Sequence, residues 1–234
     1  MLLGVVLLYV GVVLVVNGIW LIGQAQAAQV RVAAERRKVP VGASVVGHPA
    51  VDEEAAAAEA AAGDELAGRP VVSMARAEAS PLFIQNREVA VLNVFTGFIG
   101  VAVAITLLVQ GSIAGDLASV RGAGYILLFA FTYLWVSANQ FLNAGGRAFG
   151  WYCLFVAITA VPAGIYTLQA ADGNTALIWL AINWFAWAVL WALFWALLVL
   201  ELPIARFTGW VAVLEGIGTA WALAIAVLEG KLSF

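Results

Sequence analysis

Long runs of apolar residues, separated by polar segments, dominate the chain. A helix needs roughly 20 apolar residues to cross the hydrocarbon core of a bilayer. Runs of that length predict six transmembrane helices, at 2–23, 89–109, 123–143, 149–169, 175–200 and 208–228. The connections after residue 89 are short, so successive helices are expected to be antiparallel neighbours in one compact bundle.

The connection 24–88 has a different composition. It holds most of the Asp, Glu, Lys and Arg residues, is rich in Ala, Glu, Gly and Pro, and has almost no aromatic residues. Such a segment buries too little apolar surface to fold alone. Residues 52–66, DEEAAAAEAAAGDEL, can form a helix through the propensity of alanine. The remainder is expected to be a largely disordered insertion between the helix at 1–23 and a single membrane domain at 89–234.

Composition supports this class. Of the 234 residues, 64% are hydrophobic and only 11% charged, whereas a soluble domain is about a quarter charged. The chain is therefore predicted to be an all-α polytopic membrane protein. With a net charge of −3 and no basic patch, a nucleic-acid partner is not expected. Ala25-Gln26-Ala27 resembles a signal-peptidase site, but the apolar run before it is too long and lacks a basic start, so the first helix is expected to be retained.

The basic residues predict an orientation. Of the 11 Lys and Arg residues, all except Arg121 and Lys231 lie in the first, third and fifth loops. Cytoplasmic loops carry the excess of Lys and Arg, so these three loops are expected in the cytoplasm and both termini outside.

Only one ionisable residue, Glu215, lies well inside a predicted helix. Such residues are costly in lipid and often functional. The alternative is a structural carboxylate, bonded to backbone or to Thr219. A proton-coupled carrier that uses Glu215 remains an alternative, although no second buried acid or base accompanies it.

Catalytic and metal-binding patterns are missing from the sequence. The one histidine, His48, and the one cysteine, Cys153, have no partners that would form a metal site or a catalytic group. We expect no enzyme activity, no metal and no cofactor.

Aromatic residues instead follow helical faces. Trp184, Trp187, Trp191 and Trp195 are spaced 3, 4 and 4 apart, which aligns them through the middle of one predicted helix. Membrane helix interfaces favour small residues, so four indoles are better explained as the wall of a narrow path; Trp195 is also suited to anchor the helix at an interface. Similar faces, which packing could also explain, are formed by Phe131, Trp135 and Asn139, and by Leu3, Leu7, Val10, Leu14 and Asn17. Amides on these faces suit a neutral polar solute or bonds between helices.

Five segments carry a resemblance to known proteins: LLYVGVVLVVNG (7–18), FTYLW (131–135), WYCLFVAITAVPAGI (151–165), WFAWAVLW (184–191) and LPIARFTGWVAVLEGIGTAW (202–221). They resemble the urea channel and amide transporter family (AmiS/UreI). The resemblance implies a ring of six-helix protomers, a hexamer with one pore each, in the bacterial cytoplasmic membrane. It also implies passive passage of urea or short amides such as acetamide toward a cytoplasmic urease or amidase. The implied pore residues are Leu3, Leu7, Val10, Leu14, Asn17, Phe131, Trp135, Trp184, Trp187, Trp191 and Glu215.

Two departures from the family pattern bear on function. The acid-activated urea channels have tyrosine where this chain has Trp135, which favours a change in the preferred solute. They also carry histidines in extracellular loops, and the corresponding loops here have none. Histidine-based acid gating is therefore not expected. The sequence does not separate urea from short amides, and it leaves open an interaction protein that acts through 24–88.

Overall fold

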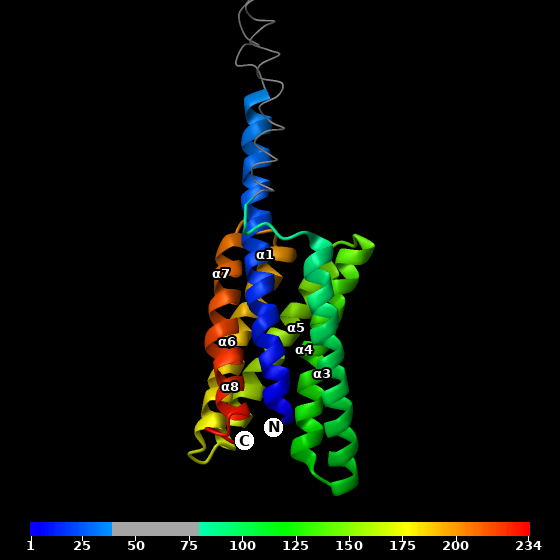
Figure 1. Cartoon of the computed structure of the whole chain (residues 1–234), viewed down its shortest axis with the longest axis vertical. Helices are drawn as coiled ribbons and strands as arrows, with labels where there is room; N and C mark the ends of the chain where they lie inside the picture. The colour runs from blue at the N-terminus through cyan, green and yellow to red at the C-terminus, as the bar shows by residue number, and fades with distance from the viewer. Residues whose placement is uncertain (39–79) are drawn as a thin grey trace, which may run out of the picture. The chain divides into compact units, whose positions relative to one another are not determined.

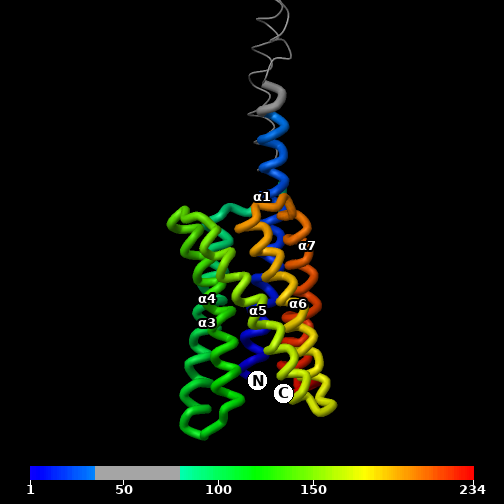
Figure 2. The backbone as a smooth tube through the Cα atoms, turned by 180° about the vertical axis from the view of Figure 1, so that it is seen from behind, coloured from blue at the N-terminus to red at the C-terminus, as the bar shows by residue number. Residues whose placement is uncertain are grey.

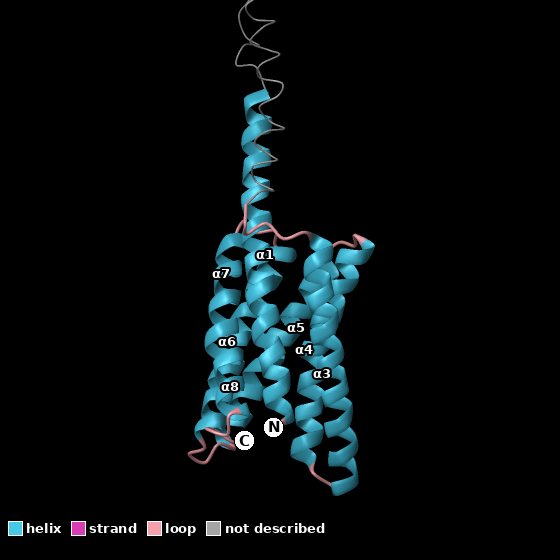
Figure 3. Cartoon of the chain, in the orientation of Figure 1, coloured by secondary structure: helices cyan, strands magenta, loops and turns pink. Residues whose placement is uncertain are grey.

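The computed structural model describes residues 1–38 and 80–234, and helices account for nearly all of them (Figures 1 and 3). The helices are α1 (Leu2–Lys38), α3 (Asn86–Ala114), α4 (Leu117–Leu142), α5 (Arg147–Gln169), α6 (Thr175–Leu198), α7 (Ala205–Glu215), the π-helical segment η1 (Gly216–Trp221) and α8 (Ala222–Leu228). The last three continue one another across Ala205–Leu228. Within residues 1–38 and 80–234, six helices are long and apolar enough to cross a membrane, which confirms the predicted all-α class and number of spans.

The chain divides into two compact units, Met1–Ile22 with Ile84–Phe234, and Gly23–Phe83. Within the second unit, helix α1 continues to Lys38, whereas the sequence analysis ended the helix at residue 23. The continuation QAQAAQVRVAAERRK consists largely of good helix formers and contains neither Gly nor Pro. The rest of the predicted insertion, with His48 and residues 52–66, lies outside the described residues.

In the first unit, neighbouring helices pair as the short loops predict. Helix α3 packs along α4, and α5 along α6 (Figure 2). Helix α4 begins at Leu117 rather than at 123, because a polar cap starts it before the apolar run. The Asp116 carboxylate accepts hydrogen bonds from the Ala118 backbone N–H at 3.0 Å and from the Ser119 hydroxyl at 2.6 Å. The N and C termini lie at the same end of this unit (Figures 1 and 2), as an even number of spans requires.

Glycines bring α1 against the α7–η1–α8 span. A Cβ added at Gly11 would lie 2.7 Å from the Trp221 backbone nitrogen, and one at Gly18 would lie 2.5 Å from the Gly209 carbonyl oxygen. Only glycine permits so close an approach of two membrane helices. This contact fixes the position of α1, whose opposite face carries the stripe that begins at Leu3.

Candidate functional site

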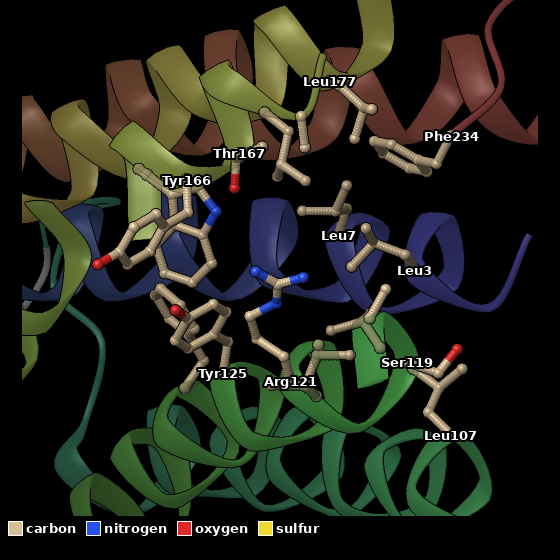
Figure 4. A pocket seen from close by; sticks show the side chains of 18 of the residues that line it. Leu3, Leu7, Leu107, Ser119, Arg121, Tyr125, Tyr166, Thr167, Leu177 and Phe234 are labelled. Atoms are coloured by element: carbon tan, nitrogen blue, oxygen red, sulfur yellow. The ribbon is translucent and has the colours of Figure 1, made fainter. Parts of the chain in front are cut away.

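One face of α1 lines two cavities in succession. The first has a volume of about 510 Å³ and lies between α1, α4, α5 and α6 (Figure 4). Leu3, Leu7 and Val10 line it from α1, opposite Trp184 and Trp187 of α6. Among the described residues in its wall, Arg121 has the only charged side chain, and its guanidinium reaches into the space between α4 and α1 (Figure 4).

The second cavity lies one to two turns further along the same helices. It has a volume of about 230 Å³ and contains no charged side chain among its described lining residues. Leu14 and Asn17 of α1 line it, opposite Tyr133 of α4 and Trp191 of α6. The predicted α1 stripe is thus shared between two cavities, with Val10 in the first and Leu14 in the second.

Aromatic rings in the walls of the two cavities contact one another. The ring of Phe129, in the wall of the first cavity, lies 5.1 Å from that of Trp187 and 5.6 Å from that of Trp191, measured between centroids. A third indole, Trp184, lies 5.3 Å away. Such tilted and edge-to-face contacts favour rigid packing. Phe129 and Trp187 line the first cavity and Trp191 lines the second, and these three rings are called the aromatic layer below.

A π-helical segment holds Trp187 in this layer. The Trp187 indole N–H donates to the Thr219 hydroxyl at 3.0 Å, and this hydroxyl donates to the Glu215 backbone carbonyl. The Asn183 amide donates to the Thr219 carbonyl at 3.0 Å. Thr219 lies within η1, and π segments are frequent at functional sites because they redirect side chains and backbone groups. The bond to Thr219 occupies the only donor of Trp187.

The buried amides mostly join helices. Asn17 and Asn93 form a reciprocal pair, with nitrogen-to-oxygen distances of 3.0 and 2.7 Å, which ties α1 to α3. Asn183 bonds to Thr219 as described. These three amides therefore follow the packing alternative, although Asn17 also lines the second cavity together with Asn139.

Two hydrogen-bond donors in the wall of the second cavity have no partner. The Tyr133 hydroxyl and the Trp191 indole nitrogen are buried, and neither bonds to any described residue. Leaving a buried polar group unpaired costs about 1–3 kcal/mol, so such groups call for an explanation. Both residues are almost fully buried, each 2% exposed.

The structure brings together most, but not all, of the predicted pore residues. Leu3, Leu7, Val10, Trp184 and Trp187 line the first cavity, and Leu14, Asn17 and Trp191 line the second. Phe131, Trp135 and Glu215 line neither.

These three residues have other surroundings. Phe131 is 49% exposed. The Trp135 ring packs against Phe149 and Tyr152, at centroid distances of 5.9 and 5.4 Å. Glu215 is half-buried, and one of its carboxylate oxygens is buried without a partner among the described residues. Trp195 also lines neither cavity and contacts Trp151.

Phe129 and Tyr133 line the cavities but were not among the predicted pore residues. Helix α4 turns the stripe Ile126, Phe129, Tyr133 and Val136 toward the cavities, and this stripe lies two residues before the predicted Phe131 and Trp135. Both stripes are aromatic with helical spacing, so periodicity alone did not choose between them. In the described residues no three His, Cys, Asp or Glu side chains are grouped as a metal site would need.

Comparison with known proteins agrees with these features. The profile of AmiS/UreI family transporters matches residues 81–231. The acid-activated urea channel of Helicobacter pylori is 34% identical over 160 residues, which cover 59% of this chain and 82% of that protein. A putative amidate substrates transporter protein of Mycolicibacterium smegmatis is 37% identical over 150 residues, covering 63% and 67%.

A solved structure is also similar over the whole length. The crystal structure of the urea channel from the human gastric pathogen Helicobacter pylori matches with a TM-score of 0.65 and 27% identity, covering 99% of both chains. These relatives are named as channels and transporters. Together with the six membrane-capable helices and the match over most of the chain, the comparisons show that this multi-pass membrane protein belongs to the AmiS/UreI family of transporters.

Proposed function

We propose that the chain is a passive channel for small neutral amides, either urea or short aliphatic amides such as acetamide. The observation that carries this proposal is the succession of two cavities whose described linings contain a single charged side chain, that of Arg121, and whose walls share the aromatic layer. The names of the urea channel and the amidate transporter among its relatives support the solute class.

The wall chemistry suits a flat neutral solute. Ions would have to lose their hydration against apolar rings, so a constriction of this kind excludes them. Arg121 adds to the exclusion of cations, because its guanidinium in the wall of the first cavity repels positive charge. Urea and acetamide can slide between indole planes and replace lost water contacts with a few hydrogen bonds. The path thus favours neutral solutes, because they lose less hydration free energy than ions do on entering it.

The direct test is flux in proteoliposomes. Purified protein is expected to raise urea or acetamide permeability well above that of protein-free liposomes, as measured by stopped-flow light scattering. Measurements with urea, acetamide and longer amides at equal protein content then rank the permeabilities of these solutes. Flux equal to that of empty liposomes for every amide would refute the proposal.

Flux is expected to change by less than about twofold between about pH 5 and about pH 7.5, because no histidine is available to titrate in the described loops. Asp116, beside the first cavity, keeps its charge across this range. Hydrogen bonds from the Ser119 hydroxyl and from backbone N–H groups lower the pKa of Asp116 below its ordinary 3.8. The stabilisation that the ionised Asp116 gives to the start of α4 is therefore lost only as the pH falls below 3.8. Stopped-flow traces at the two pH values check this, and steep activation by acid would contradict it.

Assembly and orientation complete the proposal. The protomers form a ring, a hexamer, in the bacterial cytoplasmic membrane, with one path per protomer. Both termini, and with them the first cavity, face outward, and residues 24–88 lie in the cytoplasm. The solute is passed to a cytoplasmic urease or amidase. Apolar side chains exposed along α3 and α5, such as Phe98 and Phe155, suit contact with lipid or neighbouring protomers.

A proton-coupled carrier is the second candidate. The buried, unpartnered carboxylate oxygen of Glu215 favours it, while the position of Glu215 outside both cavities weighs against it. Accumulation of acetamide against its gradient, abolished by an uncoupler, would support the carrier. A protein that acts through 24–88 remains the third candidate; deletion of this segment would then abolish its function, whereas a channel would still conduct.

A further inference from the structure

The first cavity has one polar wall and one apolar wall. Its charged and hydroxyl-bearing side chains all come from α4 and α5 and are those of Ser119, Arg121, Tyr125, Tyr166 and Thr167. The side chains that α1 contributes are all apolar, namely Leu3, Val6, Leu7 and Val10. A ligand that suits this space therefore has a polar head and a short apolar chain.

Arg121 enters this cavity without a counter-charge. Its guanidinium extends from α4 toward Leu7 of α1 (Figure 4), and it forms no ion pair with a described residue. The Asp116 carboxylate, at the start of the same helix, is bonded to Ala118 and Ser119 and lies outside the described lining. No acidic side chain lies in the part of the wall that the structure describes, so this cavity attracts anions.

The guanidinium acts at a distance from the aromatic layer. Arg121 precedes Phe129 by eight residues on α4, which corresponds to a rise of about 12 Å along the helix. Further donors line the same cavity. The hydroxyls of Tyr125 and Tyr166 bond to no other described residue, so both can donate to an oxygen atom held in the cavity. The donors of this cavity thus suit a head group that only accepts hydrogen bonds.

We propose that Arg121 anchors a binding site for short aliphatic carboxylates in the first cavity, and that a bound carboxylate blocks the path. A carboxylate only accepts hydrogen bonds, and the planar guanidinium matches its two oxygens. The aliphatic chain of the ligand then lies against the apolar side chains of α1, which removes it from water. A cavity of about 510 Å³ readily holds a chain of a few carbon atoms.

The block follows from charge. A carboxylate has nearly the shape of the amide with the same chain, so it enters the same cavity. Its charge retains it at Arg121, and its hydration makes passage along apolar rings costly. The blocking effect rests on the amide channel proposed above, whereas the binding of a carboxylate does not. Binding and flux are therefore measured separately.

Binding is tested by thermal unfolding of the detergent-solubilised protein at neutral pH, in sodium butyrate and in sodium chloride of equal concentration. Butyrate is expected to raise the unfolding temperature of the wild type and not that of Arg121→Gln, because a ligand stabilises the state to which it binds. Arg147→Gln is the matched control and is expected to keep the butyrate effect. The exposed guanidinium of Arg147 is paired with Glu201 and lines neither cavity.

Flux is tested in proteoliposomes with butyrate on both sides of the membrane. Butyrate is expected to halve the acetamide flux of the wild type at about 10 mM, since one charged contact and a short chain give millimolar binding. The flux of each variant is expressed relative to its own value in chloride. Arg121→Gln should raise the half-inhibiting concentration about tenfold, the loss of one charge-assisted hydrogen bond. Arg147→Gln should keep the wild-type value.

The outcomes separate the site from the channel. Equal unfolding temperatures in butyrate and in chloride would overturn the site, as would the same butyrate effect in Arg121→Gln and the wild type. Undiminished acetamide flux at a butyrate concentration that raises the unfolding temperature would overturn the block. An effect of butyrate on unfolding that depends on Arg121, in a protein that conducts no amide, would support the site and refute the channel.

Discussion

Phe129→Ala is expected to raise the permeability for a bulkier amide, such as isobutyramide, about tenfold relative to urea, the effect of lowering a barrier by about 1.4 kcal/mol. The Phe129 ring lines the first cavity and contacts three indoles, one of which, Trp191, lines the second. Its removal leaves space at the aromatic layer that the rigid indoles cannot fill. Stopped-flow measurements with urea, acetamide and isobutyramide give the ratio.

Phe131→Ala is the matched control. It removes the same ring two residues away on the same helix, from a side chain that is 49% exposed and lines neither cavity. Its permeability ratio is expected to equal that of the wild type. The opposite result, with the ratio changed by Phe131→Ala and not by Phe129→Ala, would show that the sequence-based choice of Phe131 is the correct one. The pair thus tests which face of α4 meets the solute.

Gly18→Val is expected to prevent stable folding, with a loss of about 3 kcal/mol or more in the free energy of unfolding. The new side chain would begin 2.5 Å from the Gly209 carbonyl oxygen and 2.7 Å from the Val213 side chain, so backbone would have to move. Displacement of α1 would also remove the wall that Leu3 to Asn17 provide. Thermal unfolding and size-exclusion profiles of detergent-solubilised protein measure the loss.

Gly124→Val provides the control for helix propensity. Gly124 lies within α4, and an added Cβ there meets nothing within 4 Å. It therefore introduces the same residue into a membrane helix without a clash, and near wild-type stability is expected. Equal stability of Gly18→Val and Gly124→Val would contradict the close approach of α1 and the last span.

The apolar runs alone determined the class and the six spans. In a bilayer every backbone polar group must be bonded within its own segment, so a long apolar run has almost no choice but a helix. The same reasoning ended the first helix too early, at residue 23. Beyond that point, intrinsic helix propensity rather than apolar length continues α1 to Lys38.

Which face of each helix lines the cavities was harder to predict from the sequence. On α1 the predicted stripe from Leu3 to Asn17 lines the cavities, while Gly11 and Gly18 make the close contacts with the last span. On α4 both faces are aromatic, and only packing against α6 selects Phe129 and Tyr133 over Phe131 and Trp135. On α6 four of the five tryptophans, from Trp184 to Trp195, share the helical spacing, yet Trp195 lies outside both cavities.

Hydrogen bonding was decided by tertiary structure alone. Trp187 and Trp191 of α6 look alike in sequence, but the π segment η1 brings the Thr219 hydroxyl to Trp187, whereas the Trp191 indole nitrogen has no partner among the described residues. Which donor is free depends on contacts between helices that are distant in the chain, and local periodicity carries no information on them. The sequence therefore determined a membrane bundle with aromatic helix faces, and the packing of α1, α4 and α6 decided which of these side chains line the two cavities.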